Sequence, residues 1–261
     1  MSLTFDLSFA RRIASEAGGI LKSGAFQSHV ADRKRVETDL VTEYDRRSEK
    51  LIVEAIREQF PGDLILAEEG GQTGAPASGR RWLIDPLDGT TNFAHGLPFF
   101  CVSIALEVEG EPIIGVVQAP ALGWSFWAAR GEGAWWNGRR LAVSGTPTLG
   151  EALLATGFPY DRKTSPENNF DQFVAMKKQA QGVRRLGAAA LDLAMVGAGW
   201  LDGYWEMKLK PWDLAAGALI VTEAGGRVSA WSGGAFVVDS GEAVATNGRI
   251  HDALVAALRA V

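Results

Sequence analysis

The sequence has few of the residues that build covalent or sulfur-based sites. Cys101 is the single cysteine among the 261 residues, so neither an internal disulfide nor a cysteine zinc cluster can form. The three histidines stand apart from one another in the chain, and none is spaced to pair with a second ligand. Any metal chemistry is therefore expected to use oxygen ligands.

Long apolar runs are also missing. No stretch reaches the roughly 18 apolar residues that span a bilayer, and the first residues, MSLTFDLSFARRIASE, lack the pattern of a signal peptide. The 26 basic and 31 acidic residues give a formal charge of −5, which disfavours nucleic acid or an anionic membrane as a direct partner. We expect a cytoplasmic protein.

Two common motifs for phosphate and ester chemistry are absent as well. The chain contains no G-K-[ST] phosphate loop and no G-x-S-x-G nucleophile turn. What the chain does have is a hydrophobic fraction of 47%, enough at this length to bury a large core.

The first half of the chain combines helical and strand patterns. Apolar residues recur at helical spacing over 7–21 and 42–60, and Thr42 with Asp45 resembles a capping box. We expect a short strand at 64–67, a flexible loop at 70–79 and a strand-rich region from 81 to about 143. Turn signals at 109–110 and 137–138 indicate hairpins, so this sheet should be largely antiparallel.

The second half alternates strands and helices. Strands are expected at ALLAT, near 183–186, at 202–207 and near 243–246. Helices are expected from Ser165-Pro166-Glu167, near 188–198, at 211–226 and from 249. Because the composition changes near 145–150, we expect two packed halves, 1–147 and 148–261, within one compact unit.

The segment WLIDPLDGTTNF, residues 82–93, places two acids after an apolar strand that is expected to end at Ile84. Asp, Pro and Gly also cluster in ordinary turns, but Gly89-Thr90-Thr91 can open a short helix whose free N–H groups bind phosphate. Two carboxylates about 4 Å apart repel by about 4 kcal/mol at an effective dielectric of about 20. Acids beside a phosphate therefore need a cation between them, and oxygen ligands favour Mg²⁺ or Mn²⁺.

A rival phosphatase chemistry uses a related pattern. Haloacid-dehalogenase-type phosphatases carry D-x-D-G-T after a strand near the start of their domain, with the first aspartate as nucleophile. Here the spacing is D-x-x-D and about 80 residues precede it, which disfavours a nucleophilic aspartate.

Three separated segments together resemble the inositol monophosphatase family over nearly the whole chain. They are TDLVTEYD (38–45), Glu68-Glu69-Gly70 followed by WLIDPLDGTTNF, and PWDLAAGALIVTEAGG (211–226). Their joint presence in this order makes the match specific. The resemblance implies a layered α-β-α-β-α sandwich of the α/β class, with a largely antiparallel first sheet, a mixed second sheet, and assembly as a homodimer.

The resemblance also implies roles for individual residues. The ligands of two or three Mg²⁺ ions, for which Mn²⁺ can substitute, would be Glu68, Asp85, the carbonyl of Leu87, Asp88 and Asp213. Glu68 and Thr90, with Asp45 behind the threonine, would position and deprotonate the attacking water. The substrate contacts would be Asp88, Gly89, Thr90, Arg184, Gly187, Ala188, Ala189 and Glu206.

The implied activity is hydrolysis of a phosphate monoester by metal-activated water, sensitive to Li⁺ and without a phosphoenzyme. Glu206 favours a polyol such as myo-inositol 1-phosphate, because a carboxylate accepts hydrogen bonds from ring hydroxyls. Relatives that act on histidinol phosphate, fructose 1,6-bisphosphate or adenosine 3′,5′-bisphosphate leave the alcohol open. Some bacterial relatives act through protein partners in ribosomal RNA transcription, so a regulatory protein is the alternative of another class.

Overall fold

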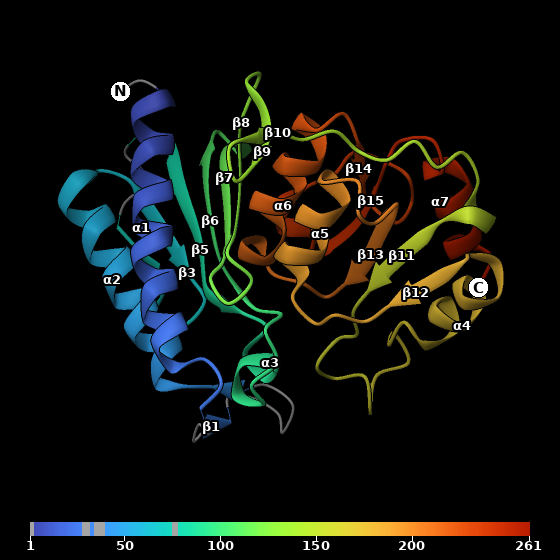
Figure 1. Cartoon of the computed structure of the whole chain (residues 1–261), viewed down its shortest axis with the longest axis horizontal. Helices are drawn as coiled ribbons and strands as arrows, with labels where there is room; N and C mark the ends of the chain where they lie inside the picture. The colour runs from blue at the N-terminus through green and yellow to red at the C-terminus, as the bar shows by residue number, and fades with distance from the viewer. Residues whose placement is uncertain (1–2, 28–31, 34–39, 75–77) are drawn as a thin grey trace.

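The computed structural model describes residues 3–27, 32–33, 40–74 and 78–261. It stacks five layers, in the order helices, sheet, helices, sheet, helices (Figure 1). This is the layered sandwich that the resemblance implies. In the first sheet the described strands pair antiparallel except for one parallel pair, and the second sheet is mixed. None of the described helices is long and apolar enough to cross a membrane.

Two long helices cover the outer face of the first sheet. They are α1 (Leu3–Gly24) and α2 (Glu43–Gln59). Ala10, Ile13, Ala14 and Ala17 are fully buried on one side of α1, which is the periodic stripe that predicted this helix. The capping box at Thr42 is confirmed and begins α2 at the expected place.

The first sheet has eight strands. In spatial order they are β10 (Arg139–Arg140), β9 (Gly133–Trp136), β8 (Trp124–Ala129), β7 (Glu111–Ala119), β6 (Cys101–Val108), β5 (Arg80–Asp88), β3 (Leu64–Ala67) and β4 (Gly71–Thr73). Both hairpin turns are confirmed, since Glu109, Gly110, Asn137 and Gly138 all have positive φ. The loop expected at 70–79 is wrong at its start, where β4 pairs with β3; residues 75–77 lie outside the described residues.

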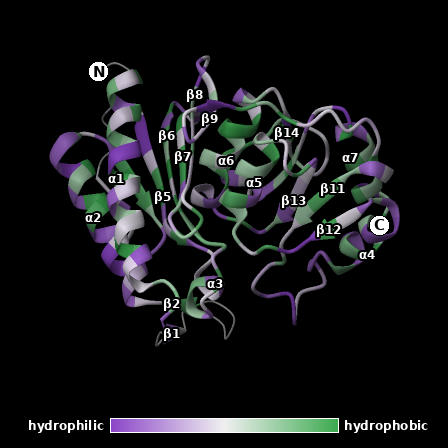
Figure 2. Cartoon of the chain, in the orientation of Figure 1, coloured by the Kyte–Doolittle hydropathy of each residue, from purple (hydrophilic) through white to green (hydrophobic). Residues whose placement is uncertain are grey.

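The middle layer consists of α5 (Ala189–Gly197) and α6 (Pro211–Glu223), which lie between the two sheets. Both helices are coloured largely as hydrophobic in Figure 2, as expected for helices buried on all sides. Close packing depends on small residues: a Cβ at Gly115 of β7 would collide with the backbone of Ala216, and one at Gly217 would collide with Leu193. The contact between Gly115 and Ala216 joins the two halves of the chain, which share one continuous core.

The second sheet has five strands and is covered on its outer face by two helices. In spatial order the strands are β12 (Gly182–Arg184), β11 (Leu153–Thr156), β13 (Gly203–Met207), β15 (Glu242–Thr246) and β14 (Arg227–Ser229). The outer helices are α4 (Phe170–Gln179) and α7 (His251–Arg259). The short elements are β1 (Asp32–Arg33), β2 (Leu40–Val41), α3 (Thr90–Ala94) and the 3₁₀ turns η1 (Leu149–Glu151) and η2 (Val238–Ser240).

The predicted start of the helix at Ser165 is wrong. The helix, α4, begins at Phe170, after Asn169 in the left-handed region with φ of 68°. The amide of Asn169 donates to the carbonyl of Gly157 at 2.7 Å and accepts from the indole N–H of Trp205 at 2.8 Å. Contacts with the neighbouring strands, rather than the Ser-Pro-Glu pattern, therefore set where this helix begins.

Candidate active site

The two acids of WLIDPLDGTTNF lie on a bulged strand. β5 does not end at Ile84, as the sequence suggested, but continues to Asp88. Its pairing with β6 shifts register between Asp85, opposite Ser103, and Asp88, opposite Cys101. Residues three apart on a regular strand point to opposite faces, whereas this irregularity allows both acids to face the same cavity.

That cavity has a volume of about 500 Å³ and opens between the two halves of the chain. Every residue predicted for the site lines it except Asp45 and Arg184. The predicted residues in its wall are Glu68, Asp85, Leu87, Asp88, Gly89, Thr90, Gly187, Ala188, Ala189, Glu206 and Asp213. Residues separated by more than a hundred positions in the sequence therefore share one wall. Thr38 and Asp39 of the first matching segment lie outside the described residues.

Asp45 lies directly behind Thr90 and is fully buried. The hydroxyl of Thr90 lies 3.1 Å from Asp45 Oδ1 and 2.9 Å from the carbonyl oxygen of Leu87, so it can donate to either. Asp45 Oδ2 accepts from the backbone N–H and the hydroxyl of Thr42, at 2.8 and 2.6 Å. The capping box that begins α2 therefore also fixes the carboxylate that supports Thr90.

Arg184 was expected in the pocket but does not line the cavity. Arg184 is exposed and its guanidinium donates to the carbonyl of Val183 at 3.4 Å. The next residue, Arg185, lines the cavity instead. Since β12 ends at Arg184, the chain leaves the sheet there and directs the second arginine toward the site.

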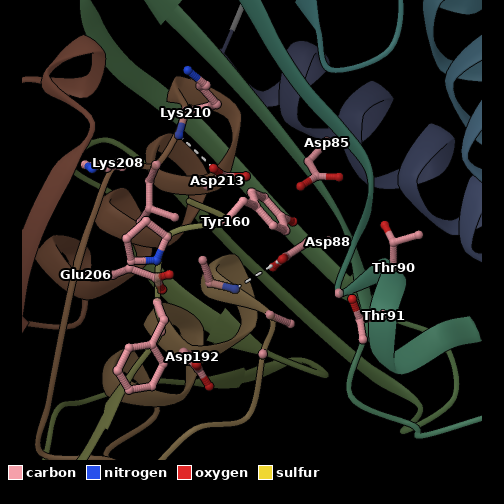
Figure 3. A pocket seen from close by; sticks show the side chains of 18 of the residues that line it. Asp85, Asp88, Thr90, Thr91, Tyr160, Asp192, Glu206, Lys208, Lys210 and Asp213 are labelled. Atoms are coloured by element: carbon pink, nitrogen blue, oxygen red, sulfur yellow. Dashed lines mark hydrogen bonds between the residues drawn. The ribbon is translucent and has the colours of Figure 1, made fainter. Parts of the chain in front are cut away.

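One oxygen of each of two acids is fixed by the backbone. Asp85 Oδ1 accepts from the N–H of Leu87 at 2.9 Å. Asp213 Oδ2 accepts from the N–H of Lys210 at 2.7 Å at the start of α6 (Figure 3). These bonds orient the carboxylates and leave the second oxygen of each available to a ligand.

Asp88 is held more fully, by the beginning of α5. Its Oδ1 accepts from the N–H of Ala189 at 3.1 Å, and its Oδ2 accepts from the N–H of Ala190 at 2.8 Å. The thiol of Cys101 lies 3.5 Å from Oδ2 and donates to it. The start of a buried helix thus aims this carboxylate into the cavity.

The acids are crowded enough to disfavour one another's charge. Desolvation raises the pKa of Asp85 and of Asp213, and the nearby charges of Glu68 and Asp88 raise both pKa values further. Desolvation also raises the pKa of Asp88 to about 6, although the hydrogen bonds that it accepts oppose this shift. A group of buried acids with raised pKa values is the arrangement that a bound cation relieves.

The donor set fits a hard divalent cation. Glu68, Asp85, Asp88 and Asp213 supply carboxylate oxygens and Leu87 supplies a carbonyl oxygen, all in one cavity wall, and oxygen donors suit Mg²⁺ or Mn²⁺. Within the described ranges, no group of three or more Asp, Glu, His or Cys side chains is arranged as a ready metal site.

The other side of the cavity is built around Glu206, which is 8% exposed. Its carboxylate accepts a short hydrogen bond from the hydroxyl of Tyr204. A Cβ at Gly157 would collide with both of its oxygens, so this glycine leaves the room that the carboxylate occupies. Desolvation raises the pKa of Glu206 to about 7.

Several residues of the cavity were not predicted. They include Tyr160, Arg185, Asp192, Lys208 and Lys210. Of these, only Asp192 could have been identified from the sequence, because it is the single charged residue in the otherwise apolar segment AALDLAMVG. Charged residues in buried helices have a specific partner or a function. The others come from irregular segments whose direction the sequence pattern does not specify.

Comparisons with known proteins agree with this geometry. The model of the inositol monophosphatase family matches residues 3–261. The chain is 50% identical over 222 residues to the inositol-1-monophosphatase of Synechocystis, covering 85% of this chain and 77% of that protein. It is 43% identical over 258 residues to the Nus factor SuhB of Pseudomonas aeruginosa, covering 97% and 95%. The structure of the inositol monophosphatase from Anabaena superposes with a TM-score of 0.91 at 42% identity, covering 100% of this chain and 98% of that one.

Proposed function

The chain belongs to the inositol monophosphatase family and is a phosphoric monoester hydrolase, and from this premise we propose that it converts myo-inositol 1-phosphate to myo-inositol and phosphate. The observation that carries this proposal is the division of a single cavity. Asp85 and Thr90 lie on one side of it and the acceptor Glu206 lies on the other (Figure 3). A phosphate ester of a polyol matches both sides at once.

We assign the metal-binding role to Glu68, Asp85, Asp88, Asp213 and the carbonyl of Leu87, for two or three Mg²⁺ ions or for Mn²⁺ in their place. When bound, such ions lower the pKa of water and offset the negative charge of the phosphoryl oxygens. The mutual repulsion of Asp85, Asp88 and Asp213 supports this assignment, since a cation removes it.

The remaining steps belong to side chains and backbone of the chain itself. The first-turn N–H groups of α3, at Gly89 and Thr90, bind phosphoryl oxygens. Glu68 and the hydroxyl of Thr90 hold the attacking water. The Thr90 oxygen receives the water proton while its own proton passes to Asp45 Oδ1, 3.1 Å away. Glu206 accepts a hydrogen bond from a ring hydroxyl and so orients the leaving group, whose oxygen takes up a proton from solvent water as its bond to phosphorus breaks.

A panel of phosphate monoesters assayed with Mg²⁺ tests the proposal. We expect the highest kcat/KM with myo-inositol 1-phosphate, compared with histidinol phosphate, fructose 1,6-bisphosphate and adenosine 3′,5′-bisphosphate, and inhibition by millimolar Li⁺. The attack by water requires that no phosphoenzyme accumulates. Trapping of an aspartyl phosphate on Asp85 would contradict the mechanism, and a clear preference for another ester would contradict the substrate.

We also propose that the protein works in the cytoplasm as a homodimer. Family membership supports the assembly. Sedimentation analysis of the purified chain tests the assembly, and a monomer at micromolar concentration would contradict it.

A second candidate function is suggested by the relatives named Nus factor SuhB, which are 40–43% identical over nearly the whole chain. We propose a regulatory interaction with the transcription machinery as the alternative to catalysis. Rescue of a deletion phenotype by an Asp88→Asn variant without phosphatase activity, together with co-purification of transcription proteins, would favour it. Rescue by the active enzyme alone would exclude it for that phenotype.

A further inference from the structure

Asp192 is a buried carboxylate in the wall of the active-site cavity, and one of its two oxygens has no partner among the residues that the structure describes. It lies in the first turn of α5 and is 2% exposed. Its Oδ1 atom has no hydrogen-bond partner in the part of the chain that the structure describes. Buried acceptors in native proteins are nearly always bonded, so this oxygen is available to a donor from a bound molecule.

The position of Asp192 assigns it to one side of the cavity. In Figure 3, Asp192 and Glu206 lie on the side opposite Asp85 and Thr90, with Asp88 between the two sides. If the phosphate ester binds at Asp85 and Thr90, the alcohol that leaves must extend toward Glu206 and Asp192. The missing donor can therefore come from that alcohol.

The charges around Asp192 favour a neutral donor. Desolvation and the nearby charges of Glu206 and Asp88 raise the pKa of Asp192, whereas Arg185 lowers it. Arg185 also lowers the pKa of Glu206, which already accepts a hydrogen bond from the hydroxyl of Tyr204. Arg185 therefore already supplies positive charge to both carboxylates, and a hydroxyl can donate the remaining hydrogen bond without placing a second cation beside Arg185.

We propose that Asp192 is a specificity residue that accepts a hydrogen bond from a second hydroxyl of the leaving alcohol, beside the hydroxyl bound by Glu206. The site then selects alcohols with at least two suitably placed hydroxyls over alcohols with one. This inference rests on the proposed function, because it assigns the alcohol side of the same cavity.

Kinetics of Asp192→Ala and Asp192→Asn test the proposal. The probes are myo-inositol 1-phosphate, 4-nitrophenyl phosphate, which offers no second hydroxyl, and phosphoethanolamine, which offers an ammonium group. The ratio of kcat/KM for the inositol ester to that for the nitrophenyl ester should fall about tenfold in Asp192→Ala, the loss expected for one buried hydrogen bond. Asp192→Asn, which keeps an acceptor oxygen, should lose less.

A binding measurement separates this inference from the proposed function. The affinity for free myo-inositol, measured by ligand-observed NMR, should weaken about tenfold in Asp192→Ala. It should not change in Met195→Leu, a control on the same helix whose side chain is partly buried and packs against the core. If the wild-type protein hydrolyses none of the esters, the proposed function fails, while the NMR comparison still tests Asp192.

Two results would overturn the assignment. One is an unchanged ratio of kcat/KM together with unchanged myo-inositol affinity in a folded Asp192→Ala protein, which would leave Asp192 a structural residue. The other is a larger loss with phosphoethanolamine than with the inositol ester in Asp192→Asn, which would assign the carboxylate to a cationic alcohol.

Discussion

Asp213 combines a structural contact with the metal-binding role that we propose for it. Its Oδ2 accepts from the N–H of Lys210 and fixes the start of α6, while the charge of the carboxylate adds to the crowding of Glu68 and Asp85. An amide in the same place would keep the first task and lose the second. This residue therefore allows the two tasks to be measured separately.

Asp213→Asn should lower Mg²⁺-dependent turnover by about a hundredfold or more, since charge stabilisation in a closed site is the largest catalytic term. The same variant should melt at a higher temperature than the wild type in EDTA, because one of the repelling charges is gone. Kinetics and thermal melts in EDTA measure both effects. Asp171→Asn, at an exposed position on α4, is the control; turnover equal to that of the control would remove Asp213 from the metal site.

Gly157 sets the position of Glu206, because the Glu206 carboxylate occupies the space that a side chain at position 157 would fill. In Gly157→Ala the new methyl group would collide with the Glu206 carboxylate, the movable end of a side chain, so the carboxylate should turn away while the fold persists. We expect KM for myo-inositol 1-phosphate to rise about tenfold relative to KM for 4-nitrophenyl phosphate. Gly150→Ala is the matched control, because its added Cβ meets only Gln179 O, at 3.8 Å. Equal changes for both esters would contradict a positioning role.

At the scale of elements, the start of α2 is also part of the site. Thr42 caps the helix and holds Asp45, which in turn supports the hydroxyl of Thr90. Removing the capping side chain should therefore affect both stability and proton transfer, two properties that are usually separate.

Thr42→Ala should lower the free energy of unfolding by about 1 kcal/mol, the cost of a lost cap, and should also reduce kcat because Asp45 is less firmly held. Thr42→Ser keeps the hydroxyl and should restore both. Urea unfolding and steady-state kinetics measure the two effects. A variant that loses stability but keeps full kcat would show that the capping bond does not reach the chemistry.

The elements most easily predicted from the sequence are those with a local cause. The stripe on α1, the capping box of α2 and the hairpin turns at 109–110 and 137–138 all depend on neighbours in the chain, and the structure has them. The bulge of β5 and the start of α4 depend on partners far away: β6 for the bulge, and Thr156, Gly157 and Trp205 for Asn169. A local sequence pattern carries no information about these long-range contacts.

The same reasoning explains the candidate site. The acids follow from short segments with distinctive spacing, and the structure places Glu68, Asp85, Asp88 and Asp213 in one wall. The choice between Arg184 and Arg185 depends on where β12 leaves its sheet, and the sequence does not specify which of two adjacent arginines turns inward.

At the scale of the whole molecule, His251 is a buried titratable group that lies away from the site. His251 is fully buried between the hydroxyls of Thr246 and Ser229, at 3.0 and 2.9 Å from its ring nitrogens, where α7 meets the second sheet. Desolvation lowers the pKa of His251 from 6.5 to about 4. The folded protein thus binds this proton less readily than the unfolded chain does.

Because the unfolded chain takes up the proton first, the contribution of His251 to stability is complete above pH 6.5 and is lost as the pH falls toward about 4. We expect His251→Gln to be less stable at neutral pH but to show a shallower decline over this range. Urea unfolding of the variant and the wild type at several pH values measures how steeply the free energy of unfolding changes with pH. The exposed His95 is present in both proteins. Parallel curves for variant and wild type would exclude His251 as the origin of the acid sensitivity.

Arg81 ties the first sheet to the C-terminal half. Its guanidinium lies 2.6 Å from Glu107 on β6 and 2.8 Å from Asp239 on η2. Glu107 is 1% exposed, and desolvation raises its pKa while the charge of Arg81 lowers it. A buried carboxylate without this partner would be an uncompensated charge.

Arg81→Met should therefore lower the free energy of unfolding by about 3 kcal/mol, as expected when one partner of a buried ion pair is removed. The double variant Arg81→Met with Glu107→Gln should recover most of that loss, because the stranded charge is gone. Arg12→Met, which breaks the exposed pair with Glu16, should cost less than about 1 kcal/mol. If the double variant is as unstable as the single one, the loss of stability comes from the contact with Asp239. Arg81 would then stabilise the protein by linking the two halves and not by compensating the buried charge.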